Sequence, residues 1–403
     1  MKKAIHFLIS QAITLFGSQV VAFAIIWYIT RETSSGVWVA LMTISSFLPQ
    51  FLMSFPGGVM ADRYPKKRLI IGADAAIAIL TLAMILMMPS IHQEGGLRVG
   101  LIILAALRSI AAGIQTPAVN AAIPLLVDSE HLMRVNGLNS TFQSVANFAA
   151  PAVAGAVMSQ MSLSWAMMID VATAIVGIAI VAFLCIPEIR NANEVPASPV
   201  EEKTGLASGI KEAIRYSRGN RSVGMTLLLF GIFIFLSVPS GFMCSLYVCR
   251  YLGDSYLNLM SMELMGFAGM LAGGVLMSTW GGFKNRFKTL CIAVALFGAL
   301  GIGLGLSRNL VMYLVLMLLY GIPLTSFQTT VSTILQETAD PQMMGRVFGL
   351  LNAMYSGFLP LGMAVFGPMA DAISLRAMMV GSNVLMLLVC IPWILPLTKE
   401  RPA

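Results

Sequence analysis

Charge is what this 403-residue chain has least of: Asp, Glu, Lys and Arg make up 11% of it, against about 25% in an average soluble domain. Five cysteines are too few for a disulfide scaffold, and the three histidines lie in separate segments without metal-ligand spacing. Hydrophobic residues instead reach 58%, and the mean hydropathy is +0.84. These values exclude a water-soluble globular protein and a disordered chain, and they leave an integral membrane protein.

Motifs for enzymatic chemistry are missing as well. The sequence has no P-loop, so an ATP-driven pump is not expected, and it has no metalloprotease motif or Cys–His pair. We therefore predict no enzyme activity, no cofactor and no metal site. The net charge of +7 does not indicate nucleic-acid binding, because the basic residues are spread over many loops without a patch of interleaved aromatics.

Long apolar runs are abundant. A bilayer core of about 30 Å needs about 20 apolar residues in a helix, whereas barrel strands need about 10 alternating ones. The runs here are continuous, which predicts an all-α membrane protein with twelve transmembrane helices. The predicted spans lie near residues 5–30, 37–61, 69–89, 99–123, 135–159, 164–186, 223–249, 255–280, 287–306, 310–334, 347–370 and 376–397.

The distribution of Lys and Arg predicts the orientation. Most of the 25 basic residues fall on the termini and on the loops that share their side, and only Arg108 falls inside a span. Because basic loops stay on the cytoplasmic side, we expect a multi-pass protein of the inner (plasma) membrane with both termini in the cytoplasm.

One polar stretch divides the chain. We predict an N-terminal six-helix bundle over residues 1–187, a cytoplasmic linker with a short amphipathic helix over 188–222, and a C-terminal six-helix bundle over 223–403. Two segments match between the halves at a nearly constant offset: residues 57–68 with 273–286, and 134–138 with 346–350. Matched halves predict two pseudo-symmetric bundles with a site at their interface.

The turn after the second span carries a recognisable pattern. Gly58, Asp62, Arg63 and Lys67 resemble the signature Gly-x-x-x-Asp-Arg-x-Gly-Arg-Lys of the major facilitator superfamily. The resemblance extends over the whole chain and is strongest to drug:proton antiporters typified by macrolide efflux proteins. It implies a cytoplasmic gate in which Asp62 docks on the start of the eleventh span. The full set of gate residues that we expect is Gly58, Asp62, Arg63, Lys67, Arg134 and Arg346.

Two further segments resemble antiporter patterns. The stretch around Arg108 in the fourth span is similar to the conserved Arg segment of these proteins. The fifth span resembles the antiporter motif Gly-x3-Gly-Pro-x2-Gly-Gly, with Ala at three of the Gly positions. Its small residues predict close helix packing. The matching residues are Ala146, Ala150, Pro151, Ala154 and Gly155.

Four ionisable residues lie inside predicted spans, where each costs about 2.5–3.5 kcal/mol unless it is compensated. The residue count places Arg108 near the midplane, Glu263 slightly outside it, Asp170 in the outer leaflet and Asp74 in the inner leaflet. Glu263 is the first candidate for proton coupling, or else a polar group in a wet cavity. Arg108 either controls a carboxylate or braces helices, Asp170 either couples or forms a structural hydrogen bond, and Asp74 either couples or belongs to the inner gate.

A substrate cavity between the halves is expected to be mainly apolar with a few polar points. The 29 Met and 21 Phe residues would give such a cavity a deformable lining, although they can equally face lipid. The polar candidates are Gln19, Gln115, Gln143, Asn147, Gln328 and Asn352.

Together these features predict a monomeric, proton-coupled exporter of lipophilic organic compounds that works by alternating access. Its expected partners are a small lipophilic substrate, protons and membrane lipid, and no nucleic acid. Three alternatives stay open: a flippase for lipids or lipid precursors, an uptake symporter, and a membrane sensor that has lost transport.

Overall fold

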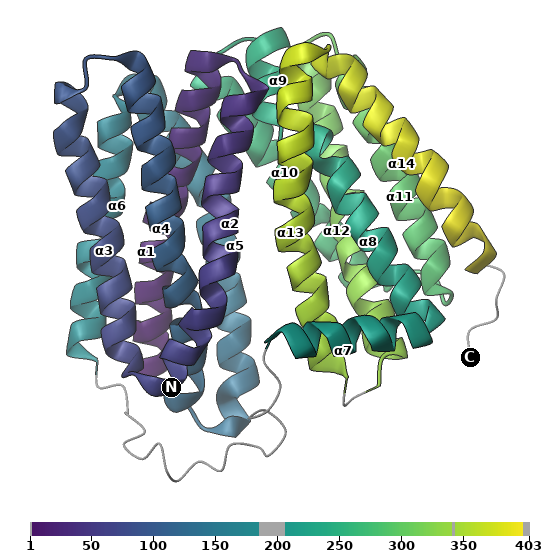
Figure 1. Ribbon diagram of the computed structural model, residues 1–403, viewed down its shortest axis with the longest axis horizontal. Helices are drawn as coiled ribbons and strands as arrows, with labels where there is room; N and C mark the ends of the chain where they lie inside the picture. The colour runs from purple at the N-terminus through teal and green to yellow at the C-terminus, as the bar shows by residue number, and fades with distance from the viewer. Residues whose placement is uncertain (1, 185–205, 341–342, 398–403) are drawn as a thin grey trace. The chain divides into compact units, whose positions relative to one another are not determined.

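The computed structural model describes residues 2–184, 206–340 and 343–397, and all regular elements in these ranges are helical (Figure 1). The first part contains α1 (Lys2–Thr33), α2 (Gly36–Arg63), α3 (Lys66–Met87), α4 (Glu94–Ala122), α5 (Ser129–Gln160) and α6 (Leu163–Phe183), with the short 3₁₀ turns η1 (Met88–Ser90) and η2 (Ile123–Leu125). The second part contains α7 (Leu206–Gly219), α8 (Arg221–Gly241), α9 (Cys244–Tyr251), α10 (Tyr256–Trp280), α11 (Arg286–Leu306), α12 (Leu310–Thr338), α13 (Met344–Ala372) and α14 (Leu375–Leu397).

The helices confirm the predicted all-α membrane fold class. Ten segments of the described chain are long and apolar enough to cross a membrane, and α5 and α14 coincide with the other two predicted spans. The predicted span at residues 223–249 coincides with the candidate span Arg221–Tyr251, but its helix is interrupted and consists of α8 and α9. Pro239 and Gly241 occupy the last turn of α8, where a missing amide donor and a flexible backbone favour a break.

The chain divides into two units, each with its own packing. The first consists of Met1–Glu32 and Leu41–Pro199, and the second of Thr33–Ala40 and Val200–Ala403. Helix α2 therefore belongs to both units, since its first turn is counted with the second unit and the rest with the first. The C-terminal part of the predicted linker, residues 206–219, forms α7, and residues 188–205 lie outside the described ranges.

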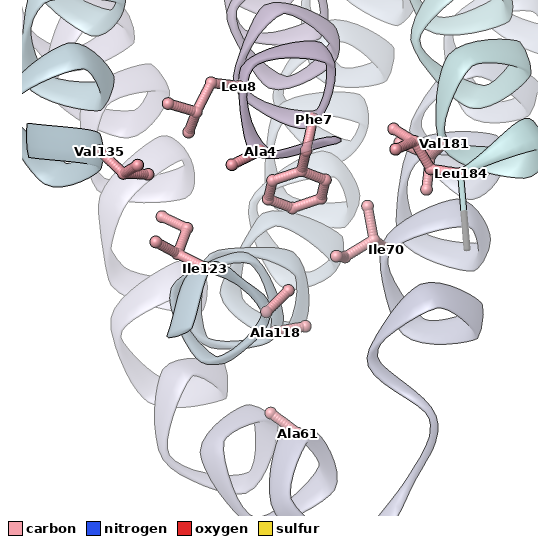
Figure 2. Packing of buried hydrophobic residues seen from close by; sticks show 11 residues of the cluster. Ala4, Phe7, Leu8, Ala61, Ile70, Ala118, Ile123, Val135, Val181 and Leu184 are labelled. Carbon is pink, nitrogen blue, oxygen red and sulfur yellow. The ribbon is translucent and has the colours of Figure 1, made fainter. Parts of the chain in front are cut away.

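A buried apolar cluster closes one end of the first unit. Phe7, near the start of α1, points among the side chains of the surrounding helices and is fully buried (Figure 2). Ile70 of α3, Ala118 of α4 and Val181 of α6 lie around it. Burial of apolar area is worth about 25 cal/mol per Å² in a protein core. The cluster thus holds the start of α1 against its neighbours.

Close backbone contact joins α10 to α12 in the second unit. A side chain at Gly269 would overlap the backbone of Leu318 and Gly321, and one at Gly321 would overlap the backbone of α10. Only glycine lets two helix backbones approach this closely. An aromatic core lies near this pair, with the rings of Phe233 and Phe327 stacked at 3.7 Å between centroids.

Helix α7 is attached to the second unit and runs across the ends of α8 and α13 (Figure 1). Glu212 forms an ion pair with Arg346 of α13 at 3.1 Å. The hydroxyl of Tyr216 accepts a hydrogen bond from the backbone amide of Asp340, and the side chain of Asn220 donates to the carbonyl of Thr338. These bonds give the predicted amphipathic helix a fixed place within the second unit.

Candidate functional site

A buried ion pair joins two helices of the first unit. The guanidinium group of Arg108 on α4 contacts the carboxylate of Asp170 on α6, and their side chains are 11% and 2% exposed. The hydroxyl groups of Ser18 on α1 and Thr81 on α3 each donate to Asp170 at 3.0 Å. The carboxylate therefore receives bonds from three other helices, which compensates much of the cost of burying its charge.

Asp74 lies on the same helix as Thr81 and is the second buried carboxylate of this region. Its Oδ1 accepts a hydrogen bond of 2.5 Å from the side-chain amide of Gln115 on α4. Its Oδ2 is buried and has no hydrogen-bond partner among the described residues. Asp74 is also within electrostatic range of Asp170. The site thus contains one fully bonded carboxylate and one that is only half bonded.

The spacing of these residues explains why they meet. Asp74 and Thr81 are seven residues apart on α3, and Arg108 and Gln115 are seven residues apart on α4. Seven residues are about two helical turns, so each pair lies on one face of its helix. Because α3 and α4 are antiparallel neighbours, Thr81 meets Arg108 at one level and Asp74 meets Gln115 at the other.

Glu263 lies apart from this cluster, on α10 of the second unit. Its side chain is half-buried, and its carboxylate has no hydrogen bond or ion pair with any residue of the described segments. It lies within electrostatic range of Cys244, whose thiol donates to the carbonyl of Ser240 at 2.9 Å. The buried hydroxyl of Tyr313 lies close to the thiol of Cys244. Glu263 therefore lies near groups that carry no compensating positive charge.

The six polar cavity candidates occupy different surroundings. Gln19 of α1 donates to Asn147 of α5 at 3.0 Å, so these two form a pair within the first unit. Gln115 is bound to Asp74, as described above. Gln143 and Asn352 are exposed and Gln328 is half-buried, and no hydrogen bond joins any of these three side chains to another described residue. Their place in a substrate cavity stays a prediction.

The gate motif shows two local contacts that the sequence did not predict. Lys67 donates to the carbonyls of Ala182 and Leu184 at 2.7 and 3.0 Å, so it caps the C-terminal end of α6. Arg346 pairs with Glu212 of α7. Asp62, Arg63 and Arg134 are exposed, and the docking of Asp62 on the start of α13 stays a prediction.

Nothing in the described structure lies within 4 Å of a side chain placed at Gly58, and the part of Gly58 in the gate stays a prediction. The neighbouring Gly57 makes a close helix contact, because a side chain there would overlap the backbone of Gly113 on α4. The two glycines differ because neighbouring residues on a helix point about 100° apart.

The antiporter-like segment of α5 forms a buried stripe. Its members recur at intervals of about one turn, and all of them are buried: Ala146, Ala150, Pro151, Ala154 and Gly155. Small residues at this spacing leave the helix surface smooth, which suits close packing of membrane helices.

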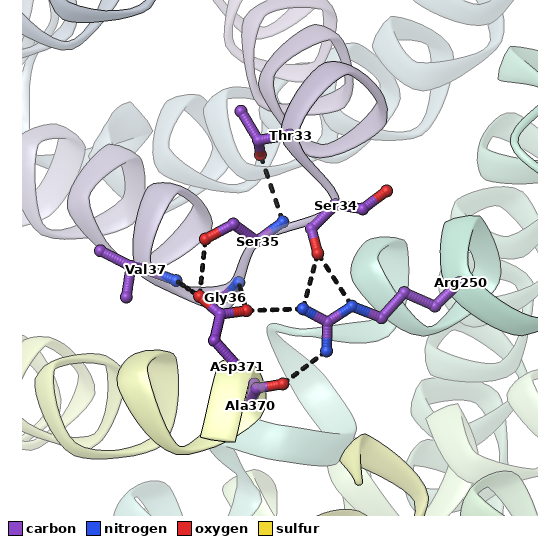
Figure 3. Close-up of polar contacts among 8 residues, drawn as sticks. All are labelled: Thr33, Ser34, Ser35, Gly36, Val37, Arg250, Ala370 and Asp371. Carbon is purple, nitrogen blue, oxygen red and sulfur yellow. Dashed lines mark hydrogen bonds and ion pairs between the residues drawn. The ribbon is translucent and has the colours of Figure 1, made fainter. Parts of the chain in front are cut away.

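Four functional candidates were missed by the sequence analysis. Ser18 and Thr81 are neutral, and only the carboxylate that they bind marks them as part of the site. Arg250 and Asp371 lie at helix ends, where charged residues are common and carry little signal. In the structure these two form an ion pair of 2.6 Å (Figure 3).

Comparison with known proteins agrees with this architecture. The sequence model of the family described as Major Facilitator Superfamily matches residues 7–363. Macrolide efflux protein A of Streptococcus pyogenes is 28% identical over 396 residues, which cover 97% of this chain and 94% of that protein. Multidrug efflux pump Tap of Mycobacterium tuberculosis is 25% identical over 376 residues, with coverage of 90% and 85%.

Solved structures share the fold at low sequence identity. A bacterial homologue of the human lysosomal transporter Spinster, in an inward-facing and unoccupied conformation, gives a TM-score of 0.69 at 15% identity and covers 100% of this chain and 98% of its own. An auto-inhibited peptide transporter of the POT family gives 0.72 at 13% identity, with the same coverage.

Proposed function

The chain belongs to the Major Facilitator Superfamily of secondary transporters, and from that premise we propose that it exports lipophilic organic compounds in exchange for protons by alternating access. Its relatives include proteins named as macrolide and multidrug efflux pumps. We further propose that it resides in the inner membrane with both termini in the cytoplasm, as the distribution of basic residues predicts.

The observation that carries the proton-coupling proposal is the charge balance of the buried cluster in the first unit. Arg108 supplies one positive charge, whereas Asp74 and Asp170 supply two negative charges when both are ionised. An uncompensated charge inside a membrane protein is costly, and binding of one proton removes it. The cluster therefore suits reversible loading of a proton.

The hydrogen bonds favour Asp74 as the group that takes up this proton. Asp170 already accepts bonds from Ser18, Thr81 and Arg108, so protonating it would disrupt several contacts. The Oδ2 atom of Asp74 has none to lose in the described structure. In the proposed cycle, Arg108 stays paired with Asp170 as long as Asp74 is protonated. When Asp74 loses its proton, the guanidinium group of Arg108 turns toward Asp74.

Glu263 is proposed as a second proton-binding group, in the second unit. The absence of a compensating cation among its described neighbours makes its ionised form costly. The proposed substrate site uses the six polar cavity candidates. The hydrogen-bonded pair of Gln19 and Asn147 supplies its polar groups in the first unit. Lipophilic substrates fit a site with few polar points in a mainly apolar lining.

The proposed function is tested in proteoliposomes that carry a pH-sensitive dye, with a macrolide and a lipophilic fluorescent dye as substrates. An imposed pH gradient is expected to drive the substrate against its own concentration gradient. Added substrate is expected to speed the collapse of the pH gradient, which the dye reports. Transport that is insensitive to the gradient would contradict proton coupling. Movement of labelled lipid alone would indicate a flippase, and movement of neither would indicate a sensor.

Asp74→Asn is expected to abolish uphill transport while leaving substrate exchange intact, because an amide mimics a permanently protonated carboxyl group. The measurement compares gradient-driven uptake with counterflow, in which preloaded substrate exchanges without a gradient. We expect uptake to fall at least about tenfold, which corresponds to an increase of about 1.4 kcal/mol in its activation free energy. Counterflow is expected to change less than about twofold. Asp128→Asn, which changes an exposed aspartate before α5, is the matched control. Full uphill transport by Asp74→Asn would remove Asp74 from the coupling role.

Glu263→Gln is expected to abolish proton-coupled transport while substrate binding stays measurable. The glutamine keeps the size of the side chain and removes its titration. Binding is followed by the substrate-dependent shift in melting temperature and transport by proton release, so the two effects are separated. Unchanged antiport would assign Glu263 a purely structural part in α10.

A further inference from the structure

The turn between α10 and α11 carries a pair of aromatic rings on the surface of the second unit. Trp280, the last residue of α10, and Phe283 pack edge to face with 4.8 Å between their ring centroids. Their side chains are 48% and 40% exposed, so the pair is not part of the core. Tryptophan at the end of a membrane span typically lies at the level of the lipid headgroups. The ring pair therefore places this turn at the surface of the bilayer.

The backbone of the turn is held in one conformation. Gly281 and Gly282 have φ angles of 72° and 77°, which side chains other than glycine rarely allow. Arg286, at the start of α11, donates from its Nη1 to the carbonyl of Gly281 at 2.8 Å. The backbone amide of Phe283 donates to the hydroxyl of Thr289 at 2.9 Å. A ligand that binds this surface does not have to order the turn first, which lowers the entropic cost of binding.

Positive charge accumulates beside the rings. Lys284 in the turn and Lys288 in the first turn of α11 are exposed, and neither forms a hydrogen bond or ion pair with a residue of the described segments. Glu337 of α12 is bound to Arg286, with 3.0 Å between Oε1 and Nη2. Three basic side chains thus meet one acidic side chain here, and the charges of the two lysines are not neutralised.

The combination of rings and lysines fits an anionic phospholipid better than a free anion. A free phosphate ion contacts the lysines and leaves the apolar rings unused. A phospholipid offers a negative phosphate to the lysines and an acyl chain to the rings, which lie at the boundary between the two. The distribution of basic residues also predicts that this turn is cytoplasmic, and anionic lipids give the cytoplasmic leaflet its negative surface potential.

We propose that the turn of residues 280–288 binds the headgroup of an anionic phospholipid, with Lys284 and Lys288 at the phosphate and the rings of Trp280 and Phe283 beside the start of an acyl chain. A lipid bound there anchors the adjoining ends of α10 and α11 at the depth of the headgroups. The site shares no residue with the proposed coupling and substrate sites, so it does not depend on the export proposal.

Quenching of Trp280 fluorescence by brominated lipids tests the site. The full-length protein is reconstituted in bilayers of phosphatidylcholine that contain either brominated phosphatidylglycerol or brominated phosphatidylcholine. The signal of Trp280 is the difference between each protein and the same protein carrying Trp280→Phe. Phosphatidylglycerol is expected to be enriched about tenfold over phosphatidylcholine at Trp280 of the parent. Equal quenching by the two lipids would overturn the proposal.

Lys284→Gln and Lys288→Gln are each expected to lower this enrichment by about threefold, and the double variant is expected to bring it close to one. Arg68→Gln is the matched control, because it removes an exposed basic residue at the end of the matching turn in the first half of the chain. The control is expected to keep the enrichment of the parent. The proposal fails if the lysine variants keep it as well, or if the control loses as much as they do.

Inorganic phosphate separates a lipid site from a site for a free anion. Millimolar phosphate is expected to lower the enrichment at Trp280 no more than chloride at equal ionic strength, because the free ion gains no contact with the rings. Displacement of brominated phosphatidylglycerol by phosphate beyond the chloride effect would assign the lysines to a free anion and would also overturn the proposal.

Discussion

Arg108→Gln is expected to lower the free energy of unfolding by about 3 kcal/mol or more and to abolish transport, the largest effect of any single substitution in the first unit. The substitution leaves the carboxylate of Asp170, which is 2% exposed, without its positive partner. Removal of one member of a buried ion pair typically costs about 3–5 kcal/mol, because the remaining charge is uncompensated. Thermal unfolding in detergent and gradient-driven transport measure the two effects.

The control for Arg108 separates the loss of pairing from the loss of a charge. Arg308→Gln removes an exposed arginine and is expected to leave the melting temperature within error of the parent. Arg108→Gln combined with Asp170→Asn is expected to recover most of the stability but no transport, because the neutral pair no longer has a charge to exchange. Equal melting temperatures for Arg108→Gln and the parent would contradict a stabilising ion pair.

Gly269→Val is expected to disrupt the second unit, because its side chain would overlap the backbone of α12 at Leu318 and Gly321. Backbone atoms cannot move aside as the end of a flexible side chain can. Overpacking of this kind costs about 1–3 kcal/mol and more where the backbone is rigid. The yield of monodisperse protein after detergent extraction and its melting temperature measure the effect.

Gly274→Val provides the comparison on the same helix. Nothing lies within 4 Å of a side chain at Gly274, so the same replacement is expected to be neutral or slightly stabilising, since glycine is a poor helix former. If the two valine variants melt at the same temperature, the close approach of α10 and α12 does not limit the stability of the protein.

Most of the fold could be predicted from the sequence because span length and polarity are local properties. The apolar runs predicted the membrane helices, and the positions of Asp74, Arg108, Asp170 and Glu263 inside them identified the costly charges. The break between α8 and α9 was missed, since a window as long as a membrane span averages over Pro239 and Gly241. Composition alone does not report where an apolar helix bends.

The partners of the charged residues could not be predicted, because partner choice depends on how each helix is rotated and which helices are neighbours. Asp170 and Arg108 were assigned separate candidate roles and are in fact a pair, and Thr81 carried no signal of its own. Asp371 and Arg250 lie at helix ends, where the sequence suggests only a loop charge. One residue of rotation also explains why Gly57, and not Gly58, meets α4.

The odd number of charges around Arg108 has an electrical consequence. A carboxylate that gains and loses a proton within the membrane moves charge through the transmembrane field, and each elementary charge that crosses it is worth about 2.3 kcal/mol per 100 mV. In the proposed cycle, with an uncharged cargo, the voltage therefore contributes driving force beside the difference in proton concentration. Export could continue on the voltage alone when the pH is equal on both sides.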